Sequence, residues 1–346
     1  MKIRRFSLYI SGLILCSLML LGYVLLVVRA PSPKQTANPK PAAKVKAQIL
    51  PLLSFAPYFI AQEEGYFADE GLEVEFVKFQ RSSDAIPALL QGQIDVVGGA
   101  LSFGLLNAMA KDQRMRLVAD KGYLSDTGCS YTSILAGKHL DPGRLNSKEA
   151  LSGLRIVTNL ASSRGYFMEE MLAGYGLTAA DVAVVDIPDA AAMEALGSGA
   201  IDLAVFVEPS ITQALESGYA AEWLRVGERL PGFQIGLLTY GPNFLQRNPD
   251  IGERFMVAYI KGVRQYNQGK TARNLEILEK NTHLGKKLLE LSCWPAFRDD
   301  GMIAGETVTA FQRWGSGRGL LDEVVDPARL INKRFTDHAN QVLRAR

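Results

Sequence analysis

The sequence predicts an α/β protein of two similar lobes with a ligand cleft between them. One pattern occurs twice: Ala-Leu-Leu-Gln-Gly-Gln-Ile-Asp at residues 88–95 and Ala-Leu-Gly-Ser-Gly-Ala-Ile-Asp at residues 195–202. Each copy leads into an apolar, strand-like run, and a Gly-Leu pair at 71–72 or 176–177 lies 21 or 23 residues before its glycine. Strands that alternate with helices of about 10 residues favour a mostly parallel sheet in each lobe.

Length and composition fit such a protein. The chain has 346 residues, 48% of them apolar and 21% charged, which is ordinary for a globular protein. A net charge of +2, without a basic stripe interleaved with aromatic residues, argues against nucleic-acid binding. The three histidines are scattered and show no metal-ligand spacing, so we expect neither a metal nor a cofactor.

Residues 1–29 are predicted to be a transmembrane anchor or a signal sequence. The uncharged run 6–28 follows Lys2, Arg4 and Arg5, and as a helix it would span roughly 34 Å, enough for a bilayer core of about 30 Å. Residues 28–30 make a poor cleavage site, which favours an uncleaved anchor over a cleaved signal peptide. The positive flank stays in the cytoplasm, so we expect an anchor in the inner membrane and a body facing the periplasm or the cell exterior.

Proline and lysine dominate the segment that follows, which predicts an extended tether. Two strand-like runs, 131–136 and 234–240, bracket the second copy of the pattern and are the expected crossings between lobes and the expected hinge. The predicted organisation is a linker at 30–47, a discontinuous lobe 1 at 48–134 and 238–346, and lobe 2 at 135–237.

The elements of lobe 1 follow from periodicity and from helix-ending residues. Residues 57–68 are apolar at helical spacing, and residues 72–79 alternate with period two. Gly71 lies between them and tolerates the left-handed conformation that ends a helix. In order, we expect a strand at 48–53, a helix at 57–68, a strand at 72–79, a helix capped by Ser83 or Asp84, and a strand at 94–97.

Lobe 2 repeats the plan. Its elements are expected as a strand at 154–158, a helix at 164–175, a strand at 182–187, a helix at 189–196 and a strand at 201–207. Residues 242–346 are mostly helical by pattern, for example at 252–266 and 272–281, and we expect them to pack back on lobe 1.

Candidate ligand residues lie where strands end, because ligands of open parallel sheets bind beyond the carboxyl ends of the strands. Gly99 and Ala100 would let a ligand approach the backbone. Arg164 with two preceding serines is either an anion clamp or a solvated arginine beside a helix cap. Glu208 has the opposite charge, so it contacts another part of the ligand or pairs with Arg164. The expected ligand-binding residues are Ser54, Phe55, Tyr58, Gly99, Ala100, Ser102, Asp120, Tyr123, Ser162, Ser163, Arg164, Glu208 and Gln234.

Sequence signals for catalysis are weak. The sequence contains neither a G-x-S-x-G motif nor a P-loop, so we expect no catalytic residues and no enzyme activity. Cys129 and Cys293 either pair as a disulfide, which an exported location permits, or remain two free buried thiols, the interpretation we prefer.

Two segments carry a family resemblance. Residues 57–77 and 88–98 resemble the nitrate/sulfonate/taurine/thiamine-precursor group of periplasmic solute-binding proteins of ABC importers, and 154–157, 199–202 and 208–209 agree with it. The resemblance covers roughly residues 48–245. It implies a type II periplasmic-binding-protein fold that closes on its solute, with the site formed by the strand-end segments.

The sequence differs from that of typical family members in two places. A long N-terminal anchor is atypical of free periplasmic members, and Arg164 stands where many members carry a small polar residue. The identity and charge of the solute therefore do not transfer. The cysteine-rich motif and active-site histidine of the fungal thiamine-precursor synthases, enzymes of similar fold, have no evident counterpart.

Together with the predicted anchor, the resemblance leads us to expect a monomeric, membrane-tethered binding protein that delivers a small organic solute to an ABC permease in the inner membrane. The alternative is the same module presenting a ligand to a membrane sensor, and an enzyme on this fold is the third hypothesis. Whether the N-terminal segment is cleaved, and whether the role is transport or sensing, stays open.

Overall fold

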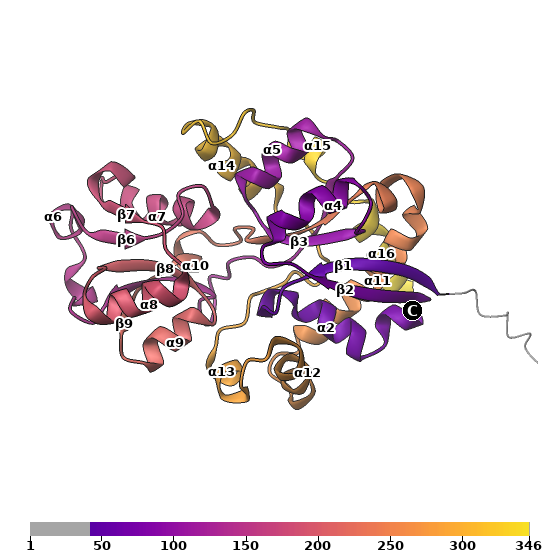
Figure 1. Ribbon diagram of the computed structural model, residues 1–346, viewed down its shortest axis with the longest axis horizontal. Helices are drawn as coiled ribbons and strands as arrows, with labels where there is room; N and C mark the ends of the chain where they lie inside the picture. Colours follow the sequence, from indigo (N-terminus) through magenta and orange to yellow (C-terminus); the bar gives the residue numbers. More distant parts are fainter. Residues whose placement is uncertain (1–41, 346) are drawn as a thin grey trace, which may run out of the picture. The chain divides into compact units, whose positions relative to one another are not determined.

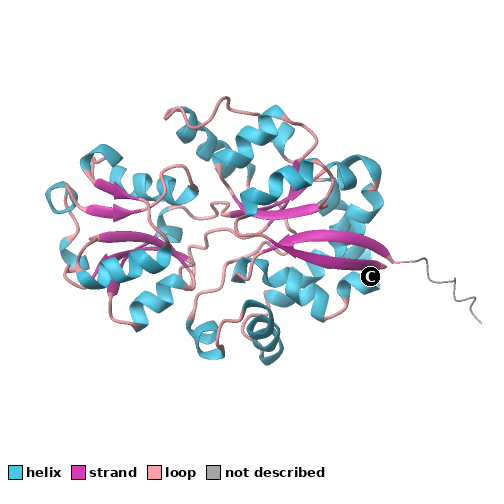
Figure 2. Ribbon diagram, viewed as in Figure 1, coloured by secondary structure: helices cyan, strands magenta, loops and turns pink. Residues whose placement is uncertain are grey.

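Two separate five-stranded sheets organise residues 42–345, the part of the chain that the computed structural model describes (Figure 1). Helices flank the faces of both sheets, so the predicted two-lobed α/β architecture is confirmed (Figure 2). The expected anchor at 1–29 and the expected linker up to residue 41 lie outside the described residues. Among the residues that are described, no helix is long and apolar enough to cross a membrane.

Each sheet has four strands in one direction and one strand in the other. The lobe 1 sheet has the order β2-β1-β3-β10-β4, and β10 runs antiparallel to both its neighbours. The lobe 2 sheet has the order β7-β6-β8-β5-β9, and β5 runs antiparallel to both its neighbours. The strands are β1 (Ala43–Ile49), β2 (Leu72–Lys78), β3 (Val96–Ala100), β4 (Arg116–Asp120), β5 (Thr132–Gly137), β6 (Arg155–Val157), β7 (Ala183–Val185), β8 (Leu203–Val207), β9 (Ala220–Arg225) and β10 (Gly236–Tyr240).

The antiparallel strands are the ones that follow the two crossings of the chain. β5 and β10 overlap the runs 131–136 and 234–240 that the sequence assigned to the crossings. A strand that runs antiparallel to its neighbours begins at the edge of the sheet where those neighbours end. The start of β5 and the start of β10 therefore lie at the same edges as the carboxyl ends of the other strands.

The first group of helices lies along lobe 1. Its helices are η1 (Leu53–Phe55), α2 (Ala56–Glu63), α3 (Tyr66–Asp69), η2 (Ser82–Ala85), α4 (Ile86–Leu90), α5 (Phe103–Lys111), η5 (Asn243–Arg247), α11 (Pro249–Tyr266), α12 (Ala272–Thr282), α13 (Lys286–Leu291), α14 (Gly305–Ser316), α15 (Pro327–Leu330) and α16 (Arg334–Ala345). α11 packs on both α2 and α16, which brings the C-terminal helices back to the start of the chain.

The helices of lobe 2 fall between its strands. They are η3 (Pro142–Arg144), α6 (Lys148–Leu151), α7 (Ser163–Ala173), η4 (Ala179–Asp181), α8 (Asp189–Ser198), α9 (Ser210–Glu216) and α10 (Val226–Arg229). α7 and α8 correspond to the two helices expected from the sequence.

The repeated sequence pattern has the same structural role in both lobes. Its glycines, Gly92 and Gly199, have φ angles of 72° and 78°, a left-handed conformation that favours glycine. Its aspartates bind the backbone of the corresponding strand of each lobe, β1 or β6: Asp95 Oδ2 accepts from Lys46 N at 2.7 Å, and Asp202 Oδ2 from Arg155 N at 2.8 Å. The repeat therefore makes the same contact with a strand in both lobes.

The first strand starts earlier than expected. β1 begins at Ala43, inside the range 30–47 assigned to the linker, and it pairs in parallel with β2 from Ala43↔Leu72 onward. The apolar residues Val45 and Ala47 are fully buried between exposed lysines. Alternation with period two, rather than lysine content, determined the structure of this segment.

The core consists of three apolar clusters, and one of them belongs to both lobes. The first cluster surrounds α2 and α11, and the third lies within lobe 2. The second contains Val97 and Leu101 from lobe 1 together with Ile134 and Ile156 from lobe 2. The lobes thus share buried apolar surface in addition to the two crossings.

Cys129 and Cys293 form a disulfide, with their Cα atoms 5.6 Å apart. This corrects the preferred interpretation of two free buried thiols. A backbone bridge between Tyr123 and Ala296 places the segment after β4 beside the segment after α13, in antiparallel directions. A pairing across 164 residues depends on this tertiary contact, which cysteine spacing does not reveal.

Candidate functional site

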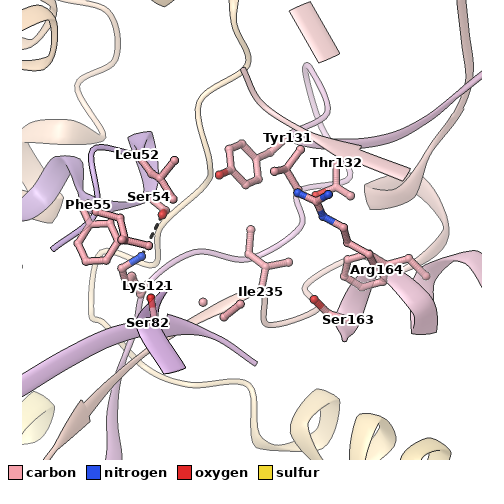
Figure 3. Close-up of a pocket in the computed structure, with 16 residues that line it drawn as sticks. Leu52, Ser54, Phe55, Ser82, Lys121, Tyr131, Thr132, Ser163, Arg164 and Ile235 are labelled. Atoms are coloured by element: carbon pink, nitrogen blue, oxygen red, sulfur yellow. Dashed lines mark hydrogen bonds between the residues drawn. The ribbon is translucent and has the colours of Figure 1, made fainter. Parts of the chain in front are cut away.

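A cavity of about 230 Å³ lies between the lobes, at the edges where the parallel strands end (Figure 3). Ala100 ends β3, Val207 ends β8, and Lys121 follows β4, while Thr132 and Gly236 begin the antiparallel strands. The lining residues are Leu50, Leu52, Ser54, Phe55, Ser82, Gly99, Ala100, Lys121, Tyr131, Thr132, Ser163, Arg164, Phe167, Val207, Ile235 and Gly236.

Some of the residues predicted to bind a ligand meet in this cavity. Lobe 1 contributes two from the turn after β1 and two from the end of β3, and lobe 2 contributes two from the start of α7. They are Ser54, Phe55, Gly99, Ala100, Ser163 and Arg164.

Tyr58 lies in the lobe 1 core instead. Its ring is fully buried, with ring centroids 5.6 Å from those of both Phe255 and Tyr259. Its hydroxyl has no hydrogen-bond partner among the described residues, and burial raises the pKa of Tyr58 far above its usual value. Tyr58 belongs to the apolar stripe by which α2 packs on α11.

Asp120 and Gln234 form a buried link between the end of β4 and the second crossing. The Gln234 amide donates to the Asp120 carboxylate and, at 3.0 Å, to the carbonyl of Gly122. Arg298 N donates to Asp120 Oδ2 at 2.8 Å, and the Arg298 guanidinium lies 4.2 Å from the centre of the Tyr123 ring. Burial raises the pKa of Asp120 to about 6, although these hydrogen bonds act in the opposite direction. Asp120, Tyr123 and Gln234 thus join the end of β4 to the start of the second crossing and to the segment 296–298.

Ser102 and Ser162 cap helices and join the lobes. Ser102 Oγ accepts from Leu105 N at the start of α5, and Ser162 Oγ accepts from Arg164 N at the start of α7. A backbone bridge pairs the two serines with each other across the lobes.

Glu208 points away from the cavity, into the start of α9. Its carboxylate accepts from Thr212 N at 3.0 Å, from Thr212 Oγ1 at 2.9 Å and from Cys293 N at 2.9 Å. Burial raises the pKa of Glu208, with the hydrogen bonds opposing it. Glu208 therefore ties lobe 2 to the segment that carries the disulfide.

Arg164 pairs with Asp189 rather than with Glu208. Its Nη1 lies 2.6 Å from Asp189 Oδ1, and Ser210 Oγ donates to Asp189 Oδ2 at 3.2 Å. The guanidinium reaches the lobe 2 side of the cavity, close to Thr132 in Figure 3. Its charge is balanced within lobe 2.

Lys121 was missed by the sequence reasoning. Its Nζ donates to Ser54 Oγ at 2.9 Å and lies 3.7 Å from the centroid of the Phe55 ring. The segment 120–123 was expected at the cleft, yet Asp120 was chosen rather than Lys121. Neighbouring residues of an extended segment point to opposite sides, so Asp120 and Lys121 do not both face the cavity. β4 is buried on both faces, so no alternation in the sequence indicated which of the two does.

Lobe 2 adds two further polar groups that the sequence reasoning did not identify. Tyr131 and Thr132 begin the first crossing strand and line the cavity. Burial raises the pKa of Tyr131 to about 12. The Thr132 hydroxyl is buried and has no hydrogen-bond partner within residues 42–345. The Thr132 hydroxyl can therefore offer a hydrogen bond to a ligand in the cavity, whereas the Tyr131 hydroxyl is hydrogen-bonded to Ser54.

Within the described residues, no group of three or more His, Cys, Asp or Glu side chains is placed to hold a metal ion. The cavity combines apolar walls with a few convergent polar groups, the composition typical of small-molecule sites.

Solved structures with this fold come from several bacteria. A ligand-binding component of an ABC-type import system from Staphylococcus aureus, solved with zinc bound, has a TM-score of 0.70 at 15% identity and covers 86% of this chain and 99% of that one. An alkanesulfonate-binding protein from Xanthomonas axonopodis pv. citri, bound to MOPS, has a TM-score of 0.66 at 17% identity, and the match covers 86% of this chain and 100% of that one. A periplasmic nitrate-binding protein from Synechocystis has a TM-score of 0.68 at 15% identity, and the match covers 88% of this chain and 90% of that one.

These similarities confirm the predicted periplasmic-binding-protein fold. No curated protein matches the sequence. The family model described as NMT1/THI5 like matches residues 53–268, more than half of the chain. The chain belongs to the NMT1/THI5-like family.

Proposed function

We propose that this protein is the substrate-binding component of an ABC-type importer, which captures a small organic solute between its lobes and delivers it to a membrane permease. The observation that carries the proposal is the cavity of about 230 Å³, lined by residues of both lobes at the strand ends. The similar structures from Staphylococcus aureus, Xanthomonas and Synechocystis, which are binding components, support it.

The cavity is large enough for a small organic molecule. A single water needs about 10–15 Å³ of probe-occupied space, and the cavity of about 230 Å³ offers many times that volume.

The proposed export follows the family, whereas the proposed anchor follows from the sequence of residues 1–29. The body is exported, acts as a monomer and stays near the membrane through residues 1–29, where it meets the permease. Sequencing the mature N-terminus from fractionated cells tests the anchor. A soluble protein that starts near residue 31 would contradict it.

Binding rather than catalysis is the proposed activity, although one contact favours a hydrolase. Ser54 and Lys121 lie at hydrogen-bond distance, as the nucleophile and base of serine hydrolases do. We expect the wild type to release no more product from p-nitrophenyl acetate than the Ser54→Ala variant does. Turnover that depends on Ser54 would support the enzyme instead.

Blocking the cavity tests the binding function. Native mass spectrometry of the purified full-length chain in a neutral detergent would identify a co-purifying solute. A ligand at 100 times its Kd should stabilise the protein by about 2.7 kcal/mol.

Ala100 lines the cavity, so we expect Ala100→Phe to abolish both the bound mass and the stabilisation. Ala161, which is exposed and outside the cavity lining, provides the matched control Ala161→Phe. Equal binding by both variants would overturn the assignment of the site.

A further inference from the structure

One ammonium group in the cavity is buried without a carboxylate partner. Lys121 is 4% exposed, and its Nζ donates to the Ser54 hydroxyl, a neutral acceptor. Among residues 42–345 no carboxylate lies within ion-pair distance of this Nζ, and its closest ring contact is with Phe55 at 3.7 Å. Burying a charge is costly unless the charge is paired, so an unpaired ammonium in a ligand cavity calls for a counter-ion.

The other cation of the cavity, Arg164, does not need a negative charge from the ligand. Arg164 forms a two-point ion pair with Asp189, at 2.6 Å and 3.1 Å. The Arg164–Asp189 pair is neutral as a unit, so Lys121 leaves the cavity with one net positive charge. One negative charge on the solute would balance it.

The surrounding backbone leaves space for the lysine. A Cβ atom at Gly98 would lie 2.6 Å from Lys121 Cε and 2.8 Å from Lys121 Cδ. Any larger residue at position 98 would displace the lysine stem. Gly98 thus accommodates the lysine, whereas Gly99 lines the cavity itself.

The other lining residues of the cavity indicate which further groups a solute there would contact. The Thr132 hydroxyl lines the cavity without a partner of its own among the described residues. Figure 3 shows Lys121 with Ser54 on one side of the cavity and Thr132 with Arg164 on the other, with Ile235 between them. Ser82, Tyr131 and Ser163 also line the cavity, and its apolar walls come from both lobes, namely Leu50, Leu52, Phe55, Phe167 and Val207.

We propose that the solute is a small organic monoanion, whose oxyanion head accepts a charge-assisted hydrogen bond from Lys121 and whose apolar body fills the space between the lobes. This inference rests on the proposed function of the cavity. Carboxylates and sulfonates share the required head group. A dianion would leave one negative charge buried without a partner.

Matched probes test the charge of the head group. The probes are benzoate, benzenesulfonate, benzamide and benzylamine, together with hexanoate and hexanamide, titrated by calorimetry into the full-length chain in a neutral detergent. We expect the acids to bind about 10- to 150-fold more tightly than the matched amides, the range for a charged hydrogen bond. Equal affinity for benzoate and benzamide would overturn the inference and leave the binding function intact.

A matched pair of variants tests the residue. Lys121→Met removes the ammonium and keeps the length of the side chain. We expect it to lose the preference for acids over amides while it raises the melting temperature of the unliganded protein, because a buried unpaired charge is removed. Lys78→Met makes the same charge change at an exposed lysine of β2 and should change neither property. Retained preference for acids in a folded Lys121→Met protein would contradict the role of Lys121.

The pH dependence gives a separate readout. Burial lowers the pKa of Lys121 to about 7, and the adjacent Asp120 carboxylate opposes this. The other ionisable groups around the cavity are Tyr131 and the Arg164–Asp189 pair, whereas η1 and β3 present none to Lys121. An anion binds the protonated amine, so its affinity should be nearly constant below about pH 6 and fall as the pH rises through 7, on the order of tenfold from pH 6 to pH 8. The affinity for benzamide should not change.

The experiments separate a failure of the proposed binding function from a failure of the proposed negative charge of the solute. A neutral solute identified by mass spectrometry in the cavity would refute the monoanion and retain the binding protein. Failure of every acid to stabilise the chain at 10 mM would likewise overturn the monoanion. An empty cavity that also binds neither acids nor amides would refute both proposals.

Discussion

At the residue scale, one carboxylate in each lobe holds the corresponding strand of its sheet, β1 in lobe 1 and β6 in lobe 2. Asp202 accepts from Arg155 N and from the Arg155 guanidinium, both at 2.8 Å, and lies 2.9 Å from His139 Nε2. The Arg155 side chain, above all, holds the pKa of Asp202 well below its usual range. Asp95 makes the corresponding contact with Lys46 N and a second one with Asn243 at 2.7 Å.

We expect Asp202→Asn to lower the free energy of unfolding at pH 7 by about 1.5–3 kcal/mol, the range for hydrogen bonds to a charged group. Because the folded-state pKa of Asp202 is depressed, its contribution is present above the unfolded value of about 3.9 and is lost as the pH falls below it. The difference between wild type and variant should therefore shrink in acid. Urea unfolding at pH 7 and at pH 3.5 measures both effects.

Asp126→Asn is the control, because Asp126 is exposed in the loop after β4. A surface substitution of this kind should change the free energy of unfolding by no more than about 0.5 kcal/mol. If Asp202→Asn behaves like Asp126→Asn at pH 7, the strand-holding role is wrong.

The same scale shows what the sequence could reveal about the site. Gly99, Ala100, Ser163 and Arg164 were found because they directly follow apolar strands, and strand ends meet in an α/β cleft. The partner of Arg164 was not predictable, since Asp189 lies in the first turn of another helix and becomes its neighbour only in the folded lobe. The contribution of each residue to ligand binding stays a prediction.

At the element scale, α11 lies very close to α2. A Cβ atom added at Gly262 in α11 would lie 2.3 Å from the carbonyl oxygen of Pro57 in α2. The two helices therefore touch through backbone at this glycine. Pro57 and the buried residues that follow it form the segment that carries the family resemblance.

We expect Gly262→Ala to destabilise the protein by about 1–3 kcal/mol, because the added methyl forces the helices apart and overpacks the core. This cost exceeds the gain in helix propensity, which is about 1 kcal/mol for glycine to alanine. Chemical denaturation of the two proteins measures the difference.

Gly104→Ala serves as the matched control in α5. A Cβ atom at Gly104 would meet nothing within 4 Å, so propensity alone acts there. The control should be neutral or slightly stabilising. A stabilising Gly262→Ala would show that the crossing of α2 and α11 is looser than described.

Element positions were predictable where periodicity was strong. The helices at 189–196 and 272–281 and the strand at 72–79 were expected within a few residues of α8, α12 and β2. β4 and β9 were not expected, because β4 is a short, almost wholly buried run with charged ends and β9 lacks a clear alternation of apolar and polar residues. Such strands are defined by their neighbours in the sheet more than by their own pattern.

At the scale of the whole molecule, the lobes are joined by more than the two crossings. α14 packs on lobe 1 through Phe311, whose ring centroid lies 4.3 Å from that of Phe103 in α5. Trp314 Nε1 in α14 and Arg318 Nε, just beyond the end of α14, each donate to the Glu169 carboxylate of lobe 2 at 3.0 Å. Figure 1 shows α14 beside α5 and α15 on the lobe 1 side.

Two further contacts between the lobes lie outside α14. The Ser102–Ser162 bridge joins the starts of α5 and α7, and Glu208 accepts from Cys293 N. A hinge that acts only through segments 131–136 and 234–240 would have to break these contacts to open. The sequence could not reveal them, because each one joins residues far apart in the chain.

We expect Glu169→Ala to favour an open arrangement of the lobes. Glu169 is buried, and its loss leaves the Trp314 and Arg318 donors without their acceptor across the lobes. If the cavity binds its solute only when closed, the apparent Kd increases as the closed fraction falls. X-ray scattering of the unliganded variant should give a larger radius of gyration than that of the wild type, and saturating ligand should restore the compact form.

Glu170→Ala is the matched control, since Glu170 is the exposed neighbour on α7 and makes no hydrogen bond or ion pair with the described residues. If Glu169→Ala keeps wild-type dimensions and affinity while its melting temperature falls, Glu169 stabilises the fold without controlling closure.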